Sequence, residues 1–128
     1  MEDKLITKAI EMLERAYVPY SHFPVGAALE CADGSVYTGC NVENASYGLC
    51  ICAERTAAVK AVSEGHRDFK RIVIVGNSED YCTPCGACRQ FLYEFAPELE
   101  VICLNSKREA MRTTLKELLP YGFGPEHL

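Results

Sequence analysis

The sequence has 128 residues, of which 48% are hydrophobic and 24% are charged. That length and composition fit an ordinary globular protein with a single domain spanning residues 1–128. The formal net charge of −5 argues against a nucleic-acid partner, and no apolar run is long enough to cross a membrane. Charged residues are scattered through the opening stretch MEDKLITKAIEMLERA, so we expect no secretion signal and a cytoplasmic location.

The first half of the chain shows signals for two helices and a hairpin. Apolar residues at helical spacing from Leu5 to Tyr17 predict an opening amphipathic helix. The stretches VGAALEC and SVYTGC flank Asp33-Gly34, a strong signal for a β-hairpin with a two-residue turn. Residues 53–64, AERTAAVKAVSE, are rich in helix formers and predict a helix that stops at Gly65.

The second half alternates strands and helices. RIVIVG at 71–76 and LEVICL at 99–104 predict buried strands, and GACRQFLYEF at 86–95 predicts the helix between them. Residues 107–112 are ambiguous, and we favour a fifth strand there. Thr114 is expected to cap a short last helix, LKELLP. The order predicts an α/β fold, a three-layer α/β/α sandwich with a mixed sheet of roughly five strands.

Two short stretches contain five of the eight cysteines: CICAER at 50–55 and CTPCGACRQ at 82–90. In the reducing compartment that we expect, clustered cysteines indicate a metal site or reactive thiols rather than disulfides. Each cluster lies at the N-terminus of a predicted helix. Unpaired backbone N–H groups and the helix dipole favour thiolate over thiol at that position.

Cys52, Cys85 and Cys88 are therefore candidate ligands for one zinc ion per chain, since zinc prefers sulfur and tetrahedral geometry. Three protein ligands leave the fourth position open, which is typical of a catalytic zinc site. The alternative is a closed structural site with Cys50 or Cys82 as the fourth ligand, and the spacing alone does not decide between the two.

Glu54, two residues after Cys52, favours the catalytic interpretation. A carboxylate beside a water activated by zinc can accept its proton and later deliver it, whereas a structural zinc site has no use for such a group. Three thiolates carry more charge than Zn²⁺ neutralises. We therefore expect the guanidinium of Arg55 to contact the thiolates and draw off part of that charge.

The pattern C-A-E followed by P-C-x-x-C resembles the signature of zinc nucleobase deaminases in its three-cysteine form. Five stretches, in chain order, are similar to the small homotetrameric cytidine deaminases: FPVGAAL, CNVENASYG, CAERTA, PCGACRQ and LLPYGFGP. Together they extend over nearly the whole chain, and five matching stretches are far more specific than any one of them.

The resemblance implies the cytidine deaminase fold and hydrolytic deamination of cytidine and 2′-deoxycytidine to the uridine products and ammonia, as in pyrimidine salvage. It implies that Cys52, Cys85 and Cys88 hold zinc. Glu54 would protonate N3 of the ring, activate the water that attacks C4 and protonate the leaving amine. The backbone around Ala53 would bind the exocyclic amino group of cytosine.

The same resemblance implies where the substrate binds. Phe23 would contact the base, and Asn41 and Glu43 would bind the ribose 3′-hydroxyl. Read as a strand, the stretch N-V-E places Asn41 and Glu43 on one face, two residues apart. The family is homotetrameric and completes each site from neighbouring subunits, a role that transfers to Tyr47 and Phe123.

Two other interpretations stay open. Deaminases that inactivate cytosine-containing antibiotics of the blasticidin S type share the zinc and glutamate chemistry, so only a comparison of substrates separates them. A non-catalytic zinc-binding module would use its cysteines to support a protein or RNA interface. Glu54, the open ligand position and the acidic net charge count against that module.

Overall fold

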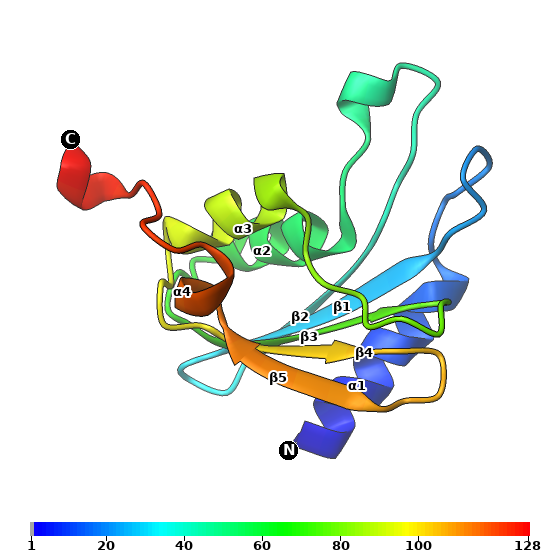
Figure 1. The fold of residues 1–128 in the computed structure, drawn as a ribbon, viewed down its shortest axis with the longest axis horizontal. Coiled ribbons are helices and arrows are strands. Elements are labelled where there is room, and N and C mark those ends of the chain that lie inside the picture. Colours follow the sequence, from blue (N-terminus) through cyan, green and yellow to red (C-terminus); the bar gives the residue numbers. More distant parts are fainter. Residues whose placement is uncertain (1) are drawn as a thin grey trace.

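A computed structural model describes residues 2–128 as a five-stranded sheet between two layers of helices, the predicted architecture (Figure 1). The principal elements follow one another along the chain as α1 (Glu2–Glu11), β1 (Val25–Cys31), β2 (Val36–Cys40), α2 (Ala53–Ser63), β3 (Phe69–Gly76), α3 (Gly86–Tyr93), β4 (Glu100–Leu104), β5 (Ala110–Thr114) and α4 (Leu115–Leu118). Short 3₁₀ turns occupy Met12–Glu14, Tyr47–Leu49 and Pro125–His127. Across residues 2–128, each helix is too short or too polar to cross a bilayer.

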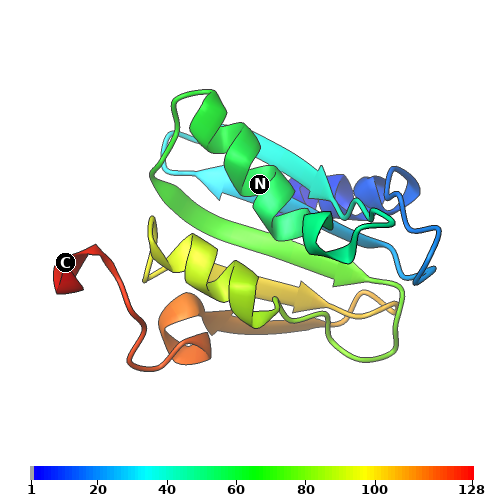
Figure 2. The same cartoon turned by 90° about the horizontal axis from the view of Figure 1, so that it is seen from above.

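The strand order is β2-β1-β3-β4-β5, and the sheet is mixed. Strands β3 and β4 run parallel because α3 connects them, whereas the other neighbouring pairs are antiparallel. Helix α1 covers one face of the sheet, and α2 and α3 lie side by side on the other (Figures 1 and 2). Both α2 and α3 begin over the same end of the strands (Figure 2).

The central strand β3 contributes to two separate cores because successive side chains of a strand point to opposite faces. Ile72 and Ile74 pack with residues of α2, α3 and α4. Val73 and Val75 pack with residues of α1 on the other face. The sheet is thus buried on both faces, which explains the nearly continuous apolar run of β3.

Helix α2 packs very close to β2 at Gly39. A Cβ atom at Gly39 would lie 2.3 Å from the carbonyl oxygen of Ala53 and 2.6 Å from the backbone nitrogen of Ala57. Only a residue without a side chain allows this approach. Gly39 thereby fixes how deep the first turn of α2 sits against the sheet.

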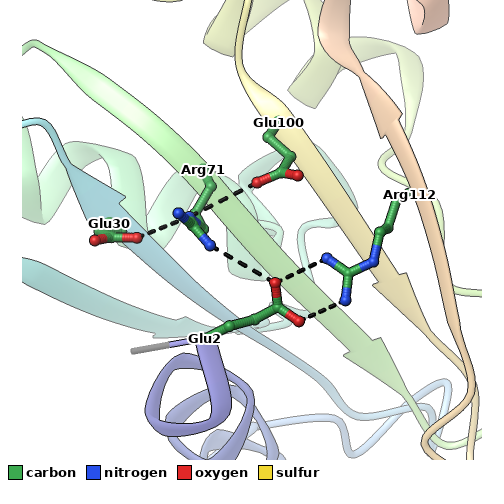
Figure 3. Close-up of polar contacts among 5 residues, drawn as sticks. All are labelled: Glu2, Glu30, Arg71, Glu100 and Arg112. Atoms are coloured by element: carbon green, nitrogen blue, oxygen red, sulfur yellow. Dashed lines mark hydrogen bonds and ion pairs between the residues drawn. The ribbon is translucent and has the colours of Figure 1, made fainter.

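A network of ion pairs attaches α1 to the sheet through Glu2 (Figure 3). The Glu2 carboxylate accepts a hydrogen bond from Arg112 of β5, with Nη1 and Oε1 2.8 Å apart, and lies 3.6 Å from Arg71 of β3. Arg71 Nε is 2.9 Å from Oε1 of the buried Glu30, an ion pair that lacks the angle of a hydrogen bond, and 3.7 Å from Glu100. Hydrogen bonding to Arg112 holds the pKa of Glu2 below its ordinary value.

Three boundaries differ from those predicted from the sequence. The opening helix does not reach Tyr17: α1 ends at Glu11, and the backbone N–H of Tyr17 instead donates to the Asn41 carbonyl. The hairpin connection has four residues, Ala32–Ser35, with Gly34 at φ 92°. The fifth strand exists but begins at Ala110, after a turn. The other predicted helices and strands, including the Thr114 cap, are confirmed to within a few residues.

Candidate active site

Three thiols meet where α2 and α3 begin. Cys52 and Cys85 are the residues immediately before the two helices, both with extended backbone, and Cys88 lies in the first turn of α3. Their sulfur atoms all lie within 4.8 Å of one another, and Cys52 Sγ is 3.8 Å from Cys85 Sγ. Three sulfurs bound tetrahedrally at the usual zinc–sulfur distance would lie about 3.8 Å apart. The donor set therefore fits a zinc ion in both chemistry and spacing.

Positive charge supports the thiolates from the α2 side. Arg55 Nη2 donates to Cys52 Sγ at 3.6 Å, so the predicted contact between Arg55 and the thiol cluster is present. Hydrogen bonds from Cys88 and then from Arg55 lower the pKa of Cys52 to about 5. The Cys88 thiol donates in that arrangement, and together with burial this raises its own pKa.

Glu54 lies directly beside the thiols. Glu54 is 4% exposed and lines a cavity of about 180 Å³ with Cys52, Cys85 and Ala53. Burial raises the pKa of Glu54 to about 7. A buried carboxylate that is easily protonated and faces a cavity is the arrangement required of a general acid–base group.

The walls of the same cavity include Phe23 and Asn41, as predicted. Asn41 does not lie in a strand, because β2 ends at Cys40. Its amide is already hydrogen-bonded within the chain: Oδ1 accepts from the N–H of Val25 and Nδ2 donates to the carbonyl of Phe23, both at 2.9 Å. Asn41 therefore holds the Phe23–Val25 segment in place, and one N–H of its amide stays available for a ligand.

Glu43 lines a separate cavity of about 320 Å³ together with Tyr20, Ser21 and Tyr47. The prediction that Glu43 lies in a strand was also wrong. Glu43 lies beyond the end of β2 and follows Val42, which forms only isolated β-bridges. Its carboxylate accepts hydrogen bonds from the N–H groups of Tyr20 and Ser21 and from the Ser21 hydroxyl. These bonds lower the pKa of Glu43.

The two aromatic residues predicted to serve neighbouring subunits are exposed in the single chain. Tyr47 is 73% exposed at the end of a loop that stands clear of the sheet (Figure 1). Phe123 is 53% exposed in the tail after α4 and does not line the Glu54 cavity. The tail is nevertheless held: Gln90 of α3 donates to the Phe123 carbonyl at 2.8 Å, and His127 stacks on the Phe123 ring.

The remaining thiols of the two motifs have other surroundings. Cys50 accepts from the N–H of Asn44 and lies in the Glu43 cavity, away from the thiol cluster. Cys82 lines the Glu54 cavity but is not a member of the three-sulfur cluster, and burial raises its pKa to about 12. Within residues 2–128, neither cysteine completes a four-thiol structural site.

Sequence reasoning did not identify three residues that shape the site. Val25 and Thr83 line the Glu54 cavity, and Gln90 anchors the tail. Val25 begins a predicted strand, so its place at the edge of the sheet was a usable signal. Thr83 and Gln90 lie inside the C-T-P-C-G-A-C-R-Q stretch without a pattern of their own.

Comparisons with known proteins agree with this geometry. Residues 1–104 match the family model described as the cytidine and deoxycytidylate deaminase zinc-binding region. The chain is 49% identical to the cytidine deaminase of Sporosarcina psychrophila, over 98% of this chain and 93% of that one. It is 50% identical to the cytidine deaminase of Halalkalibacterium halodurans, over 97% of this chain and 95% of that one.

A solved structure extends the likeness to three dimensions. The crystal structure of cytidine deaminase from Burkholderia pseudomallei matches with a TM-score of 0.93 and 48% sequence identity, over 96% of this chain and 99% of that one. The chain belongs to the cytidine and deoxycytidylate deaminase family.

Proposed function

We propose that this protein hydrolytically deaminates cytidine and 2′-deoxycytidine to uridine and 2′-deoxyuridine with release of ammonia, a step of pyrimidine salvage. The observation that carries the proposal is the buried carboxylate of Glu54, which lines one cavity with Cys52 and Cys85. Relatives that match nearly the whole chain and are named cytidine deaminase support the same reaction.

Cys52, Cys85 and Cys88 would hold one zinc ion per chain. When bound, zinc supplies Lewis acidity that lowers the pKa of a water at the open fourth position. The three thiolates exceed the charge of the ion by about one unit, and the guanidinium of Arg55 offsets that excess through its contact with Cys52. The N-termini of α2 and α3 add positive potential from two directions.

Glu54 moves the protons. It accepts one proton of the attacking water and delivers it to N3 of the ring, so that C4 becomes electrophilic. It then takes the proton of the hydroxyl added at C4 and passes it to the amino group, which leaves as ammonia while C4 becomes a carbonyl. One carboxylate serves all of these transfers because burial keeps both of its protonation states accessible near neutral pH. The backbone of Ala53, in the same cavity, is available to the exocyclic amino group.

The nucleoside would extend from the Glu54 cavity towards Glu43. Phe23 would contact the base, and Asn41 would offer its remaining N–H to the 3′-hydroxyl, with Glu43 accepting from that hydroxyl. The lowered pKa of Glu43 keeps it ionised at neutral pH. A negative charge at the sugar repels a 5′-phosphate, so we expect nucleosides to be better substrates than nucleotides.

The active form would be a homotetramer whose sites are completed by Tyr47 and Phe123 of neighbouring subunits. Their exposure in the single chain supports this, because a large aromatic ring in water gains free energy when an interface covers it. Leu49 and Ile51, beside Tyr47 in the same loop, are 64% and 44% exposed and extend the apolar surface. All eight cysteines are unpaired, which supports a cytoplasmic location.

The antibiotic-deaminase alternative gains no support, since the relatives above are named for cytidine. The non-catalytic module remains hard to reconcile with Glu54, because burying an unused carboxylate costs free energy that a structural site would not recover.

The test compares wild type with Glu54→Gln. We expect about one zinc per chain in both proteins, loss of cytidine absorbance only in the wild type, and a fall in kcat of at least about a hundredfold for the variant. Turnover by Glu54→Gln near the wild-type rate would exclude the role of Glu54. A wild type that holds zinc but leaves cytidine and deoxycytidine unchanged would exclude the proposed substrates.

A further inference from the structure

Gly76 ends the central strand at a position where a side chain would point into the active site. Ile72 and Ile74 face the layer that contains α2 and α3, and Gly76 follows them at the same two-residue spacing. It is paired directly with Val25, which lines the Glu54 cavity. The apolar run on this face of β3 is therefore interrupted where the strand reaches the site.

Two cavity residues occupy the space that a side chain at position 76 would take. A Cβ atom there would lie 3.0 Å from Cζ of Phe23, 3.1 Å from Sγ of Cys82 and 3.3 Å from Cβ of Cys82. Such distances are shorter than ordinary van der Waals contact between carbon atoms. Phe23 and Cys82 thus both lie against the bare backbone of Gly76, and both line the cavity that contains Glu54.

The two neighbours differ in how easily they can move. The backbone N–H of Cys82 donates to the carbonyl of Leu104 in β4, at 3.2 Å, which fixes Cys82 to the sheet. Phe23 is 38% exposed, so its side chain is less confined than the Cys82 backbone. A methyl group at position 76 would therefore displace the Phe23 ring rather than the Cys82 backbone.

We propose that Gly76 is a positioning residue for the Phe23 ring. The absent side chain lets the ring lie against the end of β3, where it forms one wall of the base pocket. This inference rests on the proposed function only for its kinetic consequence. The position of the ring is a property of the free protein.

The kinetic test is Gly76→Ala, with Asn77→Ala as the matched control on the adjacent exposed residue. We expect the KM for cytidine to rise about tenfold, less than the roughly hundredfold cost of a 1 Å misplacement, with kcat within about twofold. Zinc content and melting temperature should follow the control. A fall in kcat as large as the rise in KM, or a loss of zinc, would indicate a general disturbance of the site and would overturn the positioning role.

A double-mutant cycle separates positioning from structure. In a Phe23→Leu background, the ring atom that meets position 76 is gone, so adding Gly76→Ala should change KM by less than about twofold. A tenfold rise in that background as well would show that Gly76 acts on something other than Phe23.

Comparing crystal structures of Gly76→Ala and the wild type shows the position of the Phe23 ring directly and does not depend on enzymatic activity. The inference predicts that the Phe23 ring moves outward while β3 and Cys82 stay in place. A ring that keeps its wild-type position would overturn it. If the wild type does not deaminate cytidine, the proposed substrate fails, and this comparison still decides the role of Gly76.

Discussion

Arg55 Nη2 lies 3.6 Å from Cys52 Sγ, across the first turn of the helix that Cys52 precedes. The same turn contains Glu54, which lines one cavity with Cys52 and Cys85. The start of one helix thus brings a thiol, a buried carboxylate and a cation to the site. This explains why the three residue types occur so close together in the sequence.

Replacing Arg55 with alanine should weaken zinc binding. Without the guanidinium, the thiolates lose a donor and the site keeps its excess negative charge. We therefore expect the zinc Kd to rise about 10- to 100-fold, as measured by competition with a chelator. Arg67→Ala, at an exposed position away from the thiols, is the control and should bind zinc as the wild type does. Unchanged zinc affinity in Arg55→Ala would rule out the proposed electrostatic role.

Mixing two inactive variants should restore activity if Phe123 of one subunit completes the active site of another. Phe123→Ala keeps Glu54 but donates no ring, and Glu54→Gln donates a ring but cannot move protons. In mixed tetramers some sites combine an intact Glu54 with a donated Phe123, so deamination of cytidine should reappear after unfolding and refolding the variants together. Refolding each variant alone is the control. If the mixture is no more active than the sum of the two, Phe123 does not act between subunits.

The ion pairs of Glu2 should stabilise the fold at neutral pH and lose that effect in acid. Its carboxyl pKa is lowered in the folded protein from an ordinary value of 4.5, mainly by the hydrogen bond from Arg112. A lowered pKa stabilises the folded state above the unfolded pKa, and the stabilisation disappears as pH falls through the folded value. Glu2→Gln should therefore unfold at lower urea concentration than wild type at pH 7.

The same comparison of urea unfolding at acid pH is the check. Below pH 4.5 the gap between the urea midpoints of wild type and Glu2→Gln should close as Glu2 becomes protonated. Glu11→Gln, on an exposed residue at the end of α1, should show no comparable gap at either pH. A gap that persists unchanged in acid would mean that packing rather than charge is responsible.

Gly39→Ala should strongly destabilise the protein. The added methyl group would lie 2.3 Å from the Ala53 carbonyl oxygen, and backbone atoms of a helix cannot rotate away as a side chain can. We expect a loss of about 3 kcal/mol in the free energy of unfolding, at the upper end of overpacking effects. Gly48→Ala, where a Cβ meets nothing within 4 Å, is the comparison and should unfold like the wild type. Similar unfolding of both variants would disprove the tight contact between α2 and β2.

The sequence was sufficient for the elements whose signals are local. Thr114 accepts a hydrogen bond from the N–H of Glu117, the capping geometry that its position predicts. Cys52, Cys85 and Cys88 come together as predicted, because helix N-termini favour thiolates and the parallel β3–β4 connection brings two such ends to one edge of the sheet. The Thr114 cap lies within one turn of its residue, whereas Cys52 and Cys85 are 33 residues apart and were recognised because each motif marks the start of a helix.

Predictions failed where a long-range hydrogen bond overrides a local pattern. Tyr17 has helical spacing, but its backbone pairs with Asn41 and Glu43, which end the helical run and place all three residues outside regular structure. The two hydrogen bonds of the Asn41 side chain, one accepted from the Val25 N–H and one donated to the Phe23 carbonyl, likewise have no sequence signature. The part of the cavity formed by Phe23 and Asn41 is therefore less predictable than the thiol cluster.

The parallel pairing of β3 with β4 also constrains the order in which the protein can be assembled. Cys52 leaves the ribosome together with α2, but Cys85 and Cys88 are held opposite it only after α3 packs on a sheet that contains β4. These pairings are distant in sequence and form slowly compared with helices. Metal uptake is therefore expected to follow closure of the sheet, because a nascent chain that ends after α2 holds Cys52 without the two thiols that complete the cluster.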